Sequence, residues 1–253
     1  MHRPRAARAA VVTALVIALT AACSGGSGDD DSRSTTTRPF SQGVTTTTEP
    51  PLVGQPLVVA EQGVTSFPDP YDRSQSLGGY GVVLLNPNPD LLAAGVHVTT
   101  HLLDAAGTEL LVDNALLNGV MPGQRMAVGR TLIEPIAKPT QLTVTVEVSA
   151  WLRPAAPTGS LTAQEAVTEP EPYGGAVTRF AVHSGWPTNE EGVDVTAVYR
   201  AADGRVLAAE STTLEELPPG AVVLSQIRLL SPIPGLASTE VLVGRGFAAQ
   251  TVG

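Results

Sequence analysis

The chain has a single cysteine, Cys23, among its 253 residues, and only 4% of the residues are aromatic. One cysteine excludes an intramolecular disulfide, so an exported form of the chain must fold on packing alone. With so few aromatic residues, its core must be largely aliphatic. The sequence also lacks the G-x-S-x-G, H-E-x-x-H, P-loop and Rossmann signatures. We therefore predict a protein that is not an enzyme and has no cofactor and no metal site.

Positive charge is scarce too, because 15 Lys and Arg residues stand against 24 Asp and Glu residues. The formal charge of the whole chain is −9, and the three arginines Arg3, Arg5 and Arg8 lie in its first residues. Without those three positive charges the formal charge of the rest is −12. An acidic surface repels phosphate backbones, so we predict no nucleic-acid partner.

The one long apolar run, Ala9–Leu19, follows these arginines and precedes Thr20-Ala21-Ala22-Cys23. It has the length of an export-signal h-region and is shorter than the ~20 residues that span a bilayer. The segment Ala21-Ala22-Cys23 resembles the lipobox of bacterial lipoproteins, although Thr20 stands where that family prefers Leu, Val or Ile. The resemblance implies a signal peptide over residues 1–22 and a diacylglycerol on Cys23 that holds the protein at the outer face of the cell membrane. A secreted protein with an incidental cysteine is the alternative.

Residues 23–54 have the composition of a disordered tether. Gly, Ser, Thr, Asp and Pro dominate, and large apolar residues are nearly absent, so burial cannot offset the entropy cost of ordering this segment. Asp29, Asp30 and Asp31 lack the spacing of a calcium-binding loop.

From Gln55 onward, short alternating apolar runs broken by Gly, Pro, Asn and Asp are typical of an all-β protein. The clearest predicted strand is 96–103, with Val96, Val98 and Leu102 on one face and His97 and His101 on the other. These two histidines would lie ~13 Å apart, too far to share a metal ion, so we interpret them as solvent-facing. The other strands predicted in this half are 57–64, 80–85, 110–113, 125–133 and 141–151, and a loop is predicted over 66–76.

The pattern repeats at an offset of 97 residues. Gly95-Val96-x-Val98-Thr99 matches Gly192-Val193-x-Val195-Thr196, and Pro122-Gly123 matches Pro219-Gly220. Because turns and strands keep one offset, duplication is favoured over chance similarity. We predict a first domain over residues 55–152, a linker over 153–159 and a second domain over 160–253.

Each unit contains a segment similar to the signature of the FxLYD-type immunoglobulin-like domain of bacterial envelope proteins. The segments are Leu102-Leu103-Asp104-Ala105-Ala106-Gly107 and Val198-Tyr199-Arg200-Ala201-Ala202-Asp203-Gly204. The first lacks the tyrosine of the signature, and the second lacks the aspartate directly after it. This resemblance implies two tandem immunoglobulin-like β-sandwich domains in a bacterial, specifically actinobacterial, lipoprotein.

Two non-enzymatic functions remain open. The first is an interaction or accessory module for another envelope protein, with Phe67, Tyr71 and Trp186 as candidate partner-binding residues because aromatic side chains anchor interfaces. These aromatics lie in predicted polar loops, 67–76 and 184–191, and capping of their own sandwich is the competing interpretation. The second function is a passive structural spacer of the envelope. A lipid or glycolipid carrier is a further alternative, and the sequence does not indicate an oligomeric state.

Overall fold

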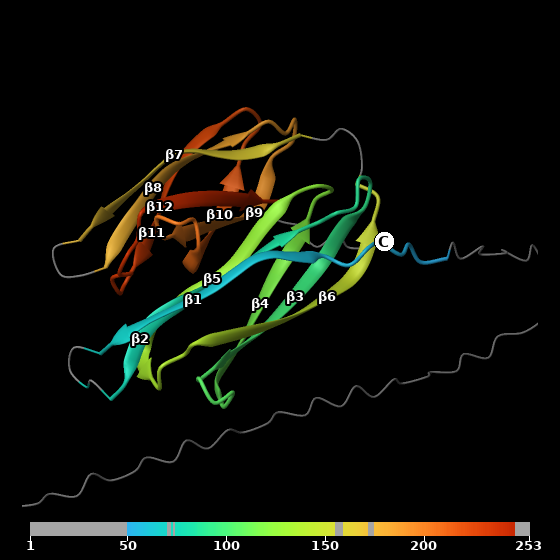
Figure 1. Ribbon diagram of the computed structural model, residues 1–253. Helices are drawn as coiled ribbons and strands as arrows, with labels where there is room; N and C mark the ends of the chain where they lie inside the picture. Colours follow the sequence, from blue (N-terminus) through green and yellow to red (C-terminus); the bar gives the residue numbers. More distant parts are fainter. Residues whose placement is uncertain (1–49, 70–71, 73, 155–158, 172–174, 246–253) are drawn as a thin grey trace, which may run out of the picture. The chain divides into compact units, whose positions relative to one another are not determined.

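The chain is built from twelve β-strands in a computed structural model that describes residues 50–69, 72, 74–154, 159–171 and 175–245 (Figure 1). The first six strands are β1 (Val58–Pro68), β2 (Ser76–Leu85), β3 (Leu92–Leu103), β4 (Glu109–Val120), β5 (Arg125–Ile136) and β6 (Gln141–Leu152). The last six are β7 (Leu161–Pro170), β8 (Ala176–Ser184), β9 (Glu190–Arg200), β10 (Val206–Leu217), β11 (Val222–Leu229) and β12 (Ser238–Gly244). None of these described segments forms a helix that could cross a membrane.

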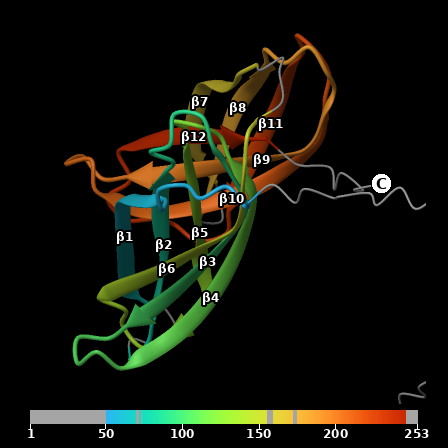
Figure 2. The same cartoon turned by 90° about the vertical axis from the view of Figure 1, so that its right-hand side faces the viewer.

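The strands form four antiparallel sheets of three strands each, so the predicted all-β fold is confirmed. The sheets β1-β2-β5 and β4-β3-β6 make up the N-terminal sandwich, and β11-β8-β7 and β10-β9-β12 make up the C-terminal sandwich. Strands β1 and β2 lie side by side both in Figure 1 and in the turned view of Figure 2. The strand order of the second half repeats that of the first, with β8 and β9 as central strands in the places of β2 and β3.

Each sandwich buries one aliphatic core between its two sheets. Val96, Val98 and Leu102 lie inside the N-terminal core, each at most 1% exposed, whereas His97 is exposed. The predicted alternation of this strand is therefore confirmed. The matching side chains of β9, Val193, Val195 and Tyr199, are fully buried in the C-terminal core.

The hairpin turn after β3 is held by Asp104. Its Oδ1 atom accepts hydrogen bonds of 2.8 Å from the backbone N–H groups of Ala106 and Thr108. Gly107 has φ +83° in this turn, and Gly204 has φ +84° at the matching position. Both values lie in the left-handed region that glycine adopts without steric cost, as the turn sequences predict.

The loop predicted over residues 66–76 is shorter in the structure. Strand β1 continues to Pro68, and Phe67 pairs with Leu77 of β2, so the assignment of Phe67 to a loop was wrong. The polar and proline residues at 66–70 suggested an earlier end to the strand. Pro68 instead takes the last strand position, where a missing backbone N–H group is tolerated.

A third buried cluster joins the two sandwiches, and residues 49–253 form one compact unit. Val83 of β2 and Ala127 of β5 pack there against Val198, Val206 and Ala209 from β9 and β10. The hydroxyl of Thr196 also donates a 3.0 Å hydrogen bond across the interface to the carbonyl oxygen of Ala127. The outer face of sheet β1-β2-β5 is thus covered by the outer face of sheet β10-β9-β12.

Glycines on the first of these faces allow a close approach. A Cβ atom on Gly63 would lie 1.9 Å from the carbonyl oxygen of Val206, and one on Gly129 would lie 2.9 Å from the Cβ atom of Ala209. Such distances cannot be accommodated without a backbone shift, so this contact requires glycine at both positions.

At one edge of this interface, four charged side chains form a network. Arg125 donates to Glu61 at 2.5 Å and to Glu240 at 2.6 Å, and Arg200 donates to the same two carboxylates. Because the network joins β1 and β5 to β9 and β12, it ties the two sandwiches together. Its hydrogen bonds, chiefly that from Arg200, hold the pKa of Glu61 below its usual range.

We expect Glu61→Gln to lower the melting temperature near neutral pH, and we expect this effect to shrink as the pH falls below about 4.3, the ordinary pKa of a glutamate. The pKa of Glu61 is lower in the folded state than in the unfolded chain. The charged side chain therefore stabilises the fold fully at pH values above the unfolded-state pKa. That contribution is lost as the pH falls through the folded-state value. Thermal melts of both proteins across this range measure the difference, and an equal destabilisation at both ends would contradict the assigned role of Glu61.

Candidate functional site

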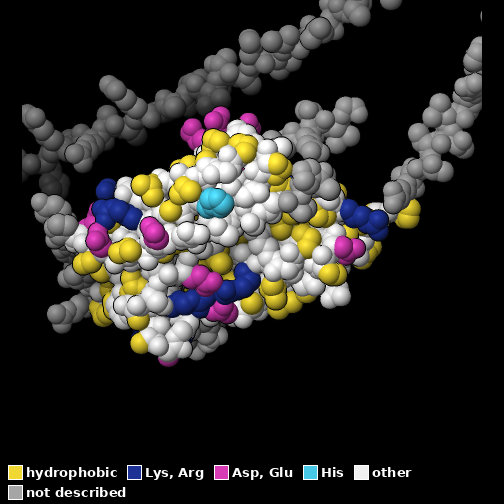
Figure 3. Space-filling view, turned by 90° about the horizontal axis from the view of Figure 1, so that it is seen from above, with side chains coloured by type: hydrophobic (Ala, Val, Ile, Leu, Met, Phe, Trp, Pro, Cys, Tyr) yellow, Lys and Arg dark blue, Asp and Glu magenta, His cyan; other side chains and the backbone are white. Residues whose placement is uncertain are grey.

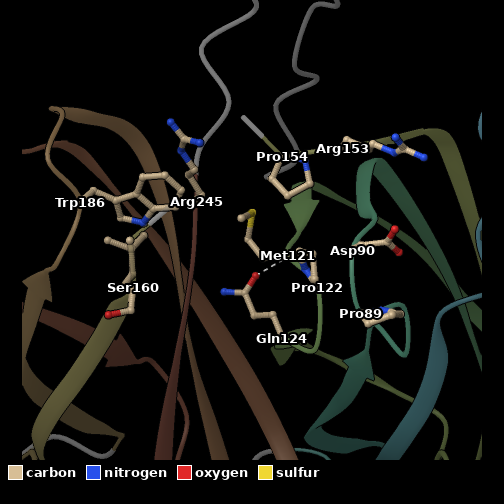
Figure 4. A pocket seen from close by; sticks show the side chains of 12 residues that line it. Pro89, Asp90, Met121, Pro122, Gln124, Arg153, Pro154, Ser160, Trp186 and Arg245 are labelled. Atoms are coloured by element: carbon tan, nitrogen blue, oxygen red, sulfur yellow. Dashed lines mark hydrogen bonds between the residues drawn. The ribbon is translucent and has the colours of Figure 1, made fainter. Parts of the chain in front are cut away.

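An open groove of about 650 Å³ lies between the two sandwiches, at the end where the β2–β3, β4–β5, β6–β7 and β8–β9 connections meet (Figure 4). We call it the loop-end groove. The N-terminal sandwich lines it with Pro89, Asp90, Met121, Pro122 and Gln124, the β6–β7 connection with Arg153, Pro154, Gly159 and Ser160, and the C-terminal sandwich with Leu161, Trp186 and Arg245.

The wall that carries Pro89 and Asp90 is fixed by a buried asparagine. The side-chain amide of Asn86 donates to the carbonyl oxygens of Leu91 and Val120 at 2.8 and 2.9 Å, and its Oδ1 atom accepts from the backbone N–H of Asn88. Because Asn86 is fully buried, these bonds satisfy a side chain that would otherwise be costly to desolvate. The Asn-Pro-Asn-Pro sequence that predicts a chain break thus forms a rigid wall.

The floor of the groove is the β4–β5 turn. The Oε1 atom of Gln124 accepts from the backbone N–H of Met121 at 2.8 Å, which closes the turn. The Nε2 atom of the same side chain donates to the carbonyl oxygen of Val243 in β12, also at 2.8 Å. Gln124 therefore fixes Met121 and Pro122 relative to the last strand of the other sandwich.

Trp186 and Arg245 form the opposite wall, as Figure 4 shows. The guanidinium carbon of Arg245 lies 4.0 Å from the ring centroid of Trp186, within cation–π range. Its Nε atom donates to Glu190, whose side chain is 1% exposed and also accepts from Thr188. A buried carboxylate needs such partners to offset its desolvation cost, so this wall is built around Glu190.

The two candidate partner-binding residues that the structure describes, Phe67 and Trp186, are not brought together. The third candidate, Tyr71, and the predicted lipidation residue Cys23 lie outside the described residues. Trp186 lines the loop-end groove but is only 4% exposed, so most of its surface packs inside the protein. Phe67 is half-buried near the end of β1 that pairs with the start of β2, whereas the groove wall follows the end of β2.

Sequence reasoning missed most of the groove. The Pro122-Gly123 turn was predicted, but Met121, Gln124, Arg153 and Arg245 were not singled out. No motif marks these side chains. They become neighbours only because the two sandwiches pack through their sheet faces, and hydrophobic alternation along one strand does not encode that contact.

Charge is distributed in small mixed groups. On the face seen in Figure 3, Lys and Arg side chains lie next to Asp and Glu side chains, among hydrophobic ones.

Within the part of the chain that the structure describes, no three His, Cys, Asp or Glu residues are close enough to hold a metal ion. His101 lies with its Nδ1 atom 2.6 Å from Glu109. The loop-end groove offers hydrogen bonds, apolar contact and charge of both signs, since Asp90 lines it together with Arg153 and Arg245.

Comparison with known proteins identifies no family for this chain. No protein-family model matches it, and no curated protein is significantly similar to it.

Proposed function

We propose that this protein is a non-enzymatic cell-envelope lipoprotein whose loop-end groove binds a partner protein. The observation that carries the proposal is the groove itself, a preformed hollow with arginine, aromatic, methionine and proline side chains in its walls. Trp, Met and Arg are enriched at protein interfaces. In this proposal the two sandwiches are FxLYD-like immunoglobulin-like domains, and the envelope is actinobacterial.

The groove chemistry favours a polypeptide ligand. Arg153 is an exposed cation at the rim, and no hydrogen bond or ion pair of its side chain occurs among the described residues. Met121 is half-buried, and its flexible thioether side chain can adapt to different apolar groups. A segment with an acidic or carbonyl group near an apolar side chain would satisfy both residues.

The site of tether attachment agrees with a role near the membrane. Gln55 and Asn88 exchange two hydrogen bonds, of 2.8 and 2.9 Å, and Asn88 directly precedes the groove residue Pro89. The proposed tether, residues 23–54, therefore joins the folded body beside the groove. In this proposal a tether of about 30 residues, if it behaved as a flexible chain, would hold the body within roughly 30 Å of the bilayer.

We expect Cys23→Ala to release the protein from the membrane, because the proposed diacylglycerol supplies two acyl chains and the substitution removes their attachment point. Membrane fractionation of cells that express the full chain measures the effect, with the unsubstituted protein as reference. Firm membrane association of the Ala variant would contradict the lipoprotein assignment.

We expect Arg153→Glu to reduce recovery of a bound envelope protein by about tenfold, because it places an acidic group at the rim of the groove. The measurement is affinity capture on the detergent-solubilised full chain, with quantitative mass spectrometry of the recovered proteins. Lys138→Glu is the matched control, since this exposed residue lies in the β5–β6 connection, next to the far end of β3. Identical recovery by the unsubstituted protein and Arg153→Glu would exclude the groove as the binding surface.

A passive spacer is the second candidate function, favoured by the buried cluster and charge network that fix one sandwich against the other. In that case no groove substitution would alter the set of recovered proteins.

A further inference from the structure

The outer face of sheet β11-β8-β7 carries exposed aliphatic side chains. Val167, Val222 and Leu224 are 54%, 61% and 81% exposed there. Strand β8 lies in the middle of this sheet, between β7 and β11 (Figure 2). We call this surface, formed by the outward side chains of the three strands, the C-terminal outer face.

The matching face of the first repeat is the contact between the sandwiches. Val83 of β2 pairs with Ala127 of β5, and both are fully buried under sheet β10-β9-β12. At the matching place in the second repeat, Ala181 of β8 pairs with Leu224 of β11. The covering sheet β10-β9-β12 consists of described residues and is already engaged with the first repeat, so it cannot also cover Leu224 in the same chain. Leu224 is therefore exposed at a place that lies in the centre of a contact in the first repeat.

Large and small side chains alternate along the outward side of β8. Phe180 points into the core, so Arg179 and Ala181 on either side of it point outward. Arg179 is exposed, and Ala181 lines a hollow of about 490 Å³ beside it. The outward positions on either side of these two continue the pattern, with a buried Val177 and a half-buried His183.

This alternation makes the face complementary to a second copy of itself. A two-fold axis that crosses β8 at Phe180 places Arg179 of each copy over Ala181 of the other. Val177 and His183 exchange in the same way, so a large side chain meets a small one at each pair. On β11, which pairs with β8 through Ser225 and Phe180, the axis brings Leu224 against Gln226 of the second copy. No two like charges face each other along either strand.

We propose that this protein forms a two-fold symmetric dimer through the C-terminal outer faces of two copies. This inference goes beyond the proposed function, because none of the residues named for this face lines the loop-end groove. Arg179 and Gln226 prevent the close approach that glycines allow in the first repeat, but sheets that pack face to face usually lie ~10 Å apart, which leaves room for such side chains.

The dimer should be closed and weak. The same surface is used on both copies, so the contact is complete with two copies and does not propagate. Because the face is only three strands wide, its area is at the low end for specific interfaces, and we expect a Kd of ~10–100 µM.

The test is sedimentation equilibrium of the detergent-solubilised full chain at concentrations on both sides of the expected Kd. Ala181→Arg fills the small position with a cation that faces Arg179 of the second copy. We expect this variant to dimerise at least tenfold more weakly than the unsubstituted protein. Position 181 faces outward, so the variant should fold, and thermal melts verify this.

The double variant Arg179→Ala/Ala181→Arg tests the two-fold axis itself. The introduced arginine then faces the introduced alanine of the second copy, so a large side chain again meets a small one, and dimerisation should return to within about threefold of its original strength. The substitution at position 179 also removes an ion pair with Glu169, but both side chains are 58% exposed, so the fold should lose little stability.

Thr99→Arg is the matched control, because it places the same side chain on the central strand of the outer face of sheet β4-β3-β6 and should leave dimerisation unchanged. A monomer at every concentration would overturn the proposal. So would a dimer that Ala181→Arg leaves intact, or a double variant that dimerises no better than Ala181→Arg alone.

Discussion

Val98→Asp is expected to unfold the N-terminal sandwich, whereas His97→Asp should leave its stability nearly unchanged. Val98 is 1% exposed and lies between the two sheets of that sandwich, whereas His97, the residue before it in β3, is exposed. A carboxylate at position 98 would lose its hydration without gaining a partner, and the buried valine side chain would be lost as well. The cost should reach about 4–5 kcal/mol, a large part of the ~5–15 kcal/mol that stabilises a typical domain.

Thermal melts followed by circular dichroism measure this contrast. Val195→Asp tests the same position in β9, where the side chain is fully buried. If the position 97 and position 98 variants melted alike, the strand register would be wrong, because a shift of one residue exchanges the two faces of a strand.

Gly63→Ala should destabilise the protein by about 3 kcal/mol or more. The added methyl group would lie 1.9 Å from the carbonyl oxygen of Val206, and a backbone atom in a paired strand cannot move away without disturbing its sheet. The substitution therefore acts on the contact between the sandwiches rather than on either core.

Gly107→Ala provides the comparison. A methyl group there meets no described atom within 4 Å, so only the positive φ carries a cost, of ~1 kcal/mol. Denaturant unfolding of both variants gives the two free energies. Similar losses would mean that the sandwiches do not approach each other as closely at Gly63 as the distances indicate.

Features that depend on local sequence were predictable. The alternation around Val98 identified the buried face of β3, and the turn glycines Gly107 and Gly204 have the expected positive φ. The end of β1 was misjudged because Pro68 was taken as a strand breaker, although the last strand position accepts proline.

The groove could not be predicted because it depends on how two sheet faces meet. Gly63 and Gly129 mark that contact, but in a sequence they are indistinguishable from turn or bulge glycines. Arg245 and Trp186 lie far apart along the chain, and their stacking follows from the path of β12 beside β9.

The contact between the sandwiches joins non-equivalent surfaces of the two repeats. Sheet β1-β2-β5 of the first covers sheet β10-β9-β12 of the second, whose counterpart in the first is β4-β3-β6. Such a heterologous contact is head-to-tail, and by itself it would let further units be added without limit.

Divergence of the repeats blocks that growth. The remaining face of the second repeat is the outer face of sheet β11-β8-β7. Arg179 and Gln226 are backbone partners in this sheet, at the place where Gly81 and Gly129 are partners in the first repeat. Because both residues carry long side chains, another sheet cannot approach this face as closely. The remaining face of the first repeat is the outer face of sheet β4-β3-β6. Leu103 and Thr143 occupy there the positions that the charged pair Arg200 and Glu240 occupies in the second repeat. The side chains on both remaining faces therefore disfavour a further copy of the contact that joins the two sandwiches.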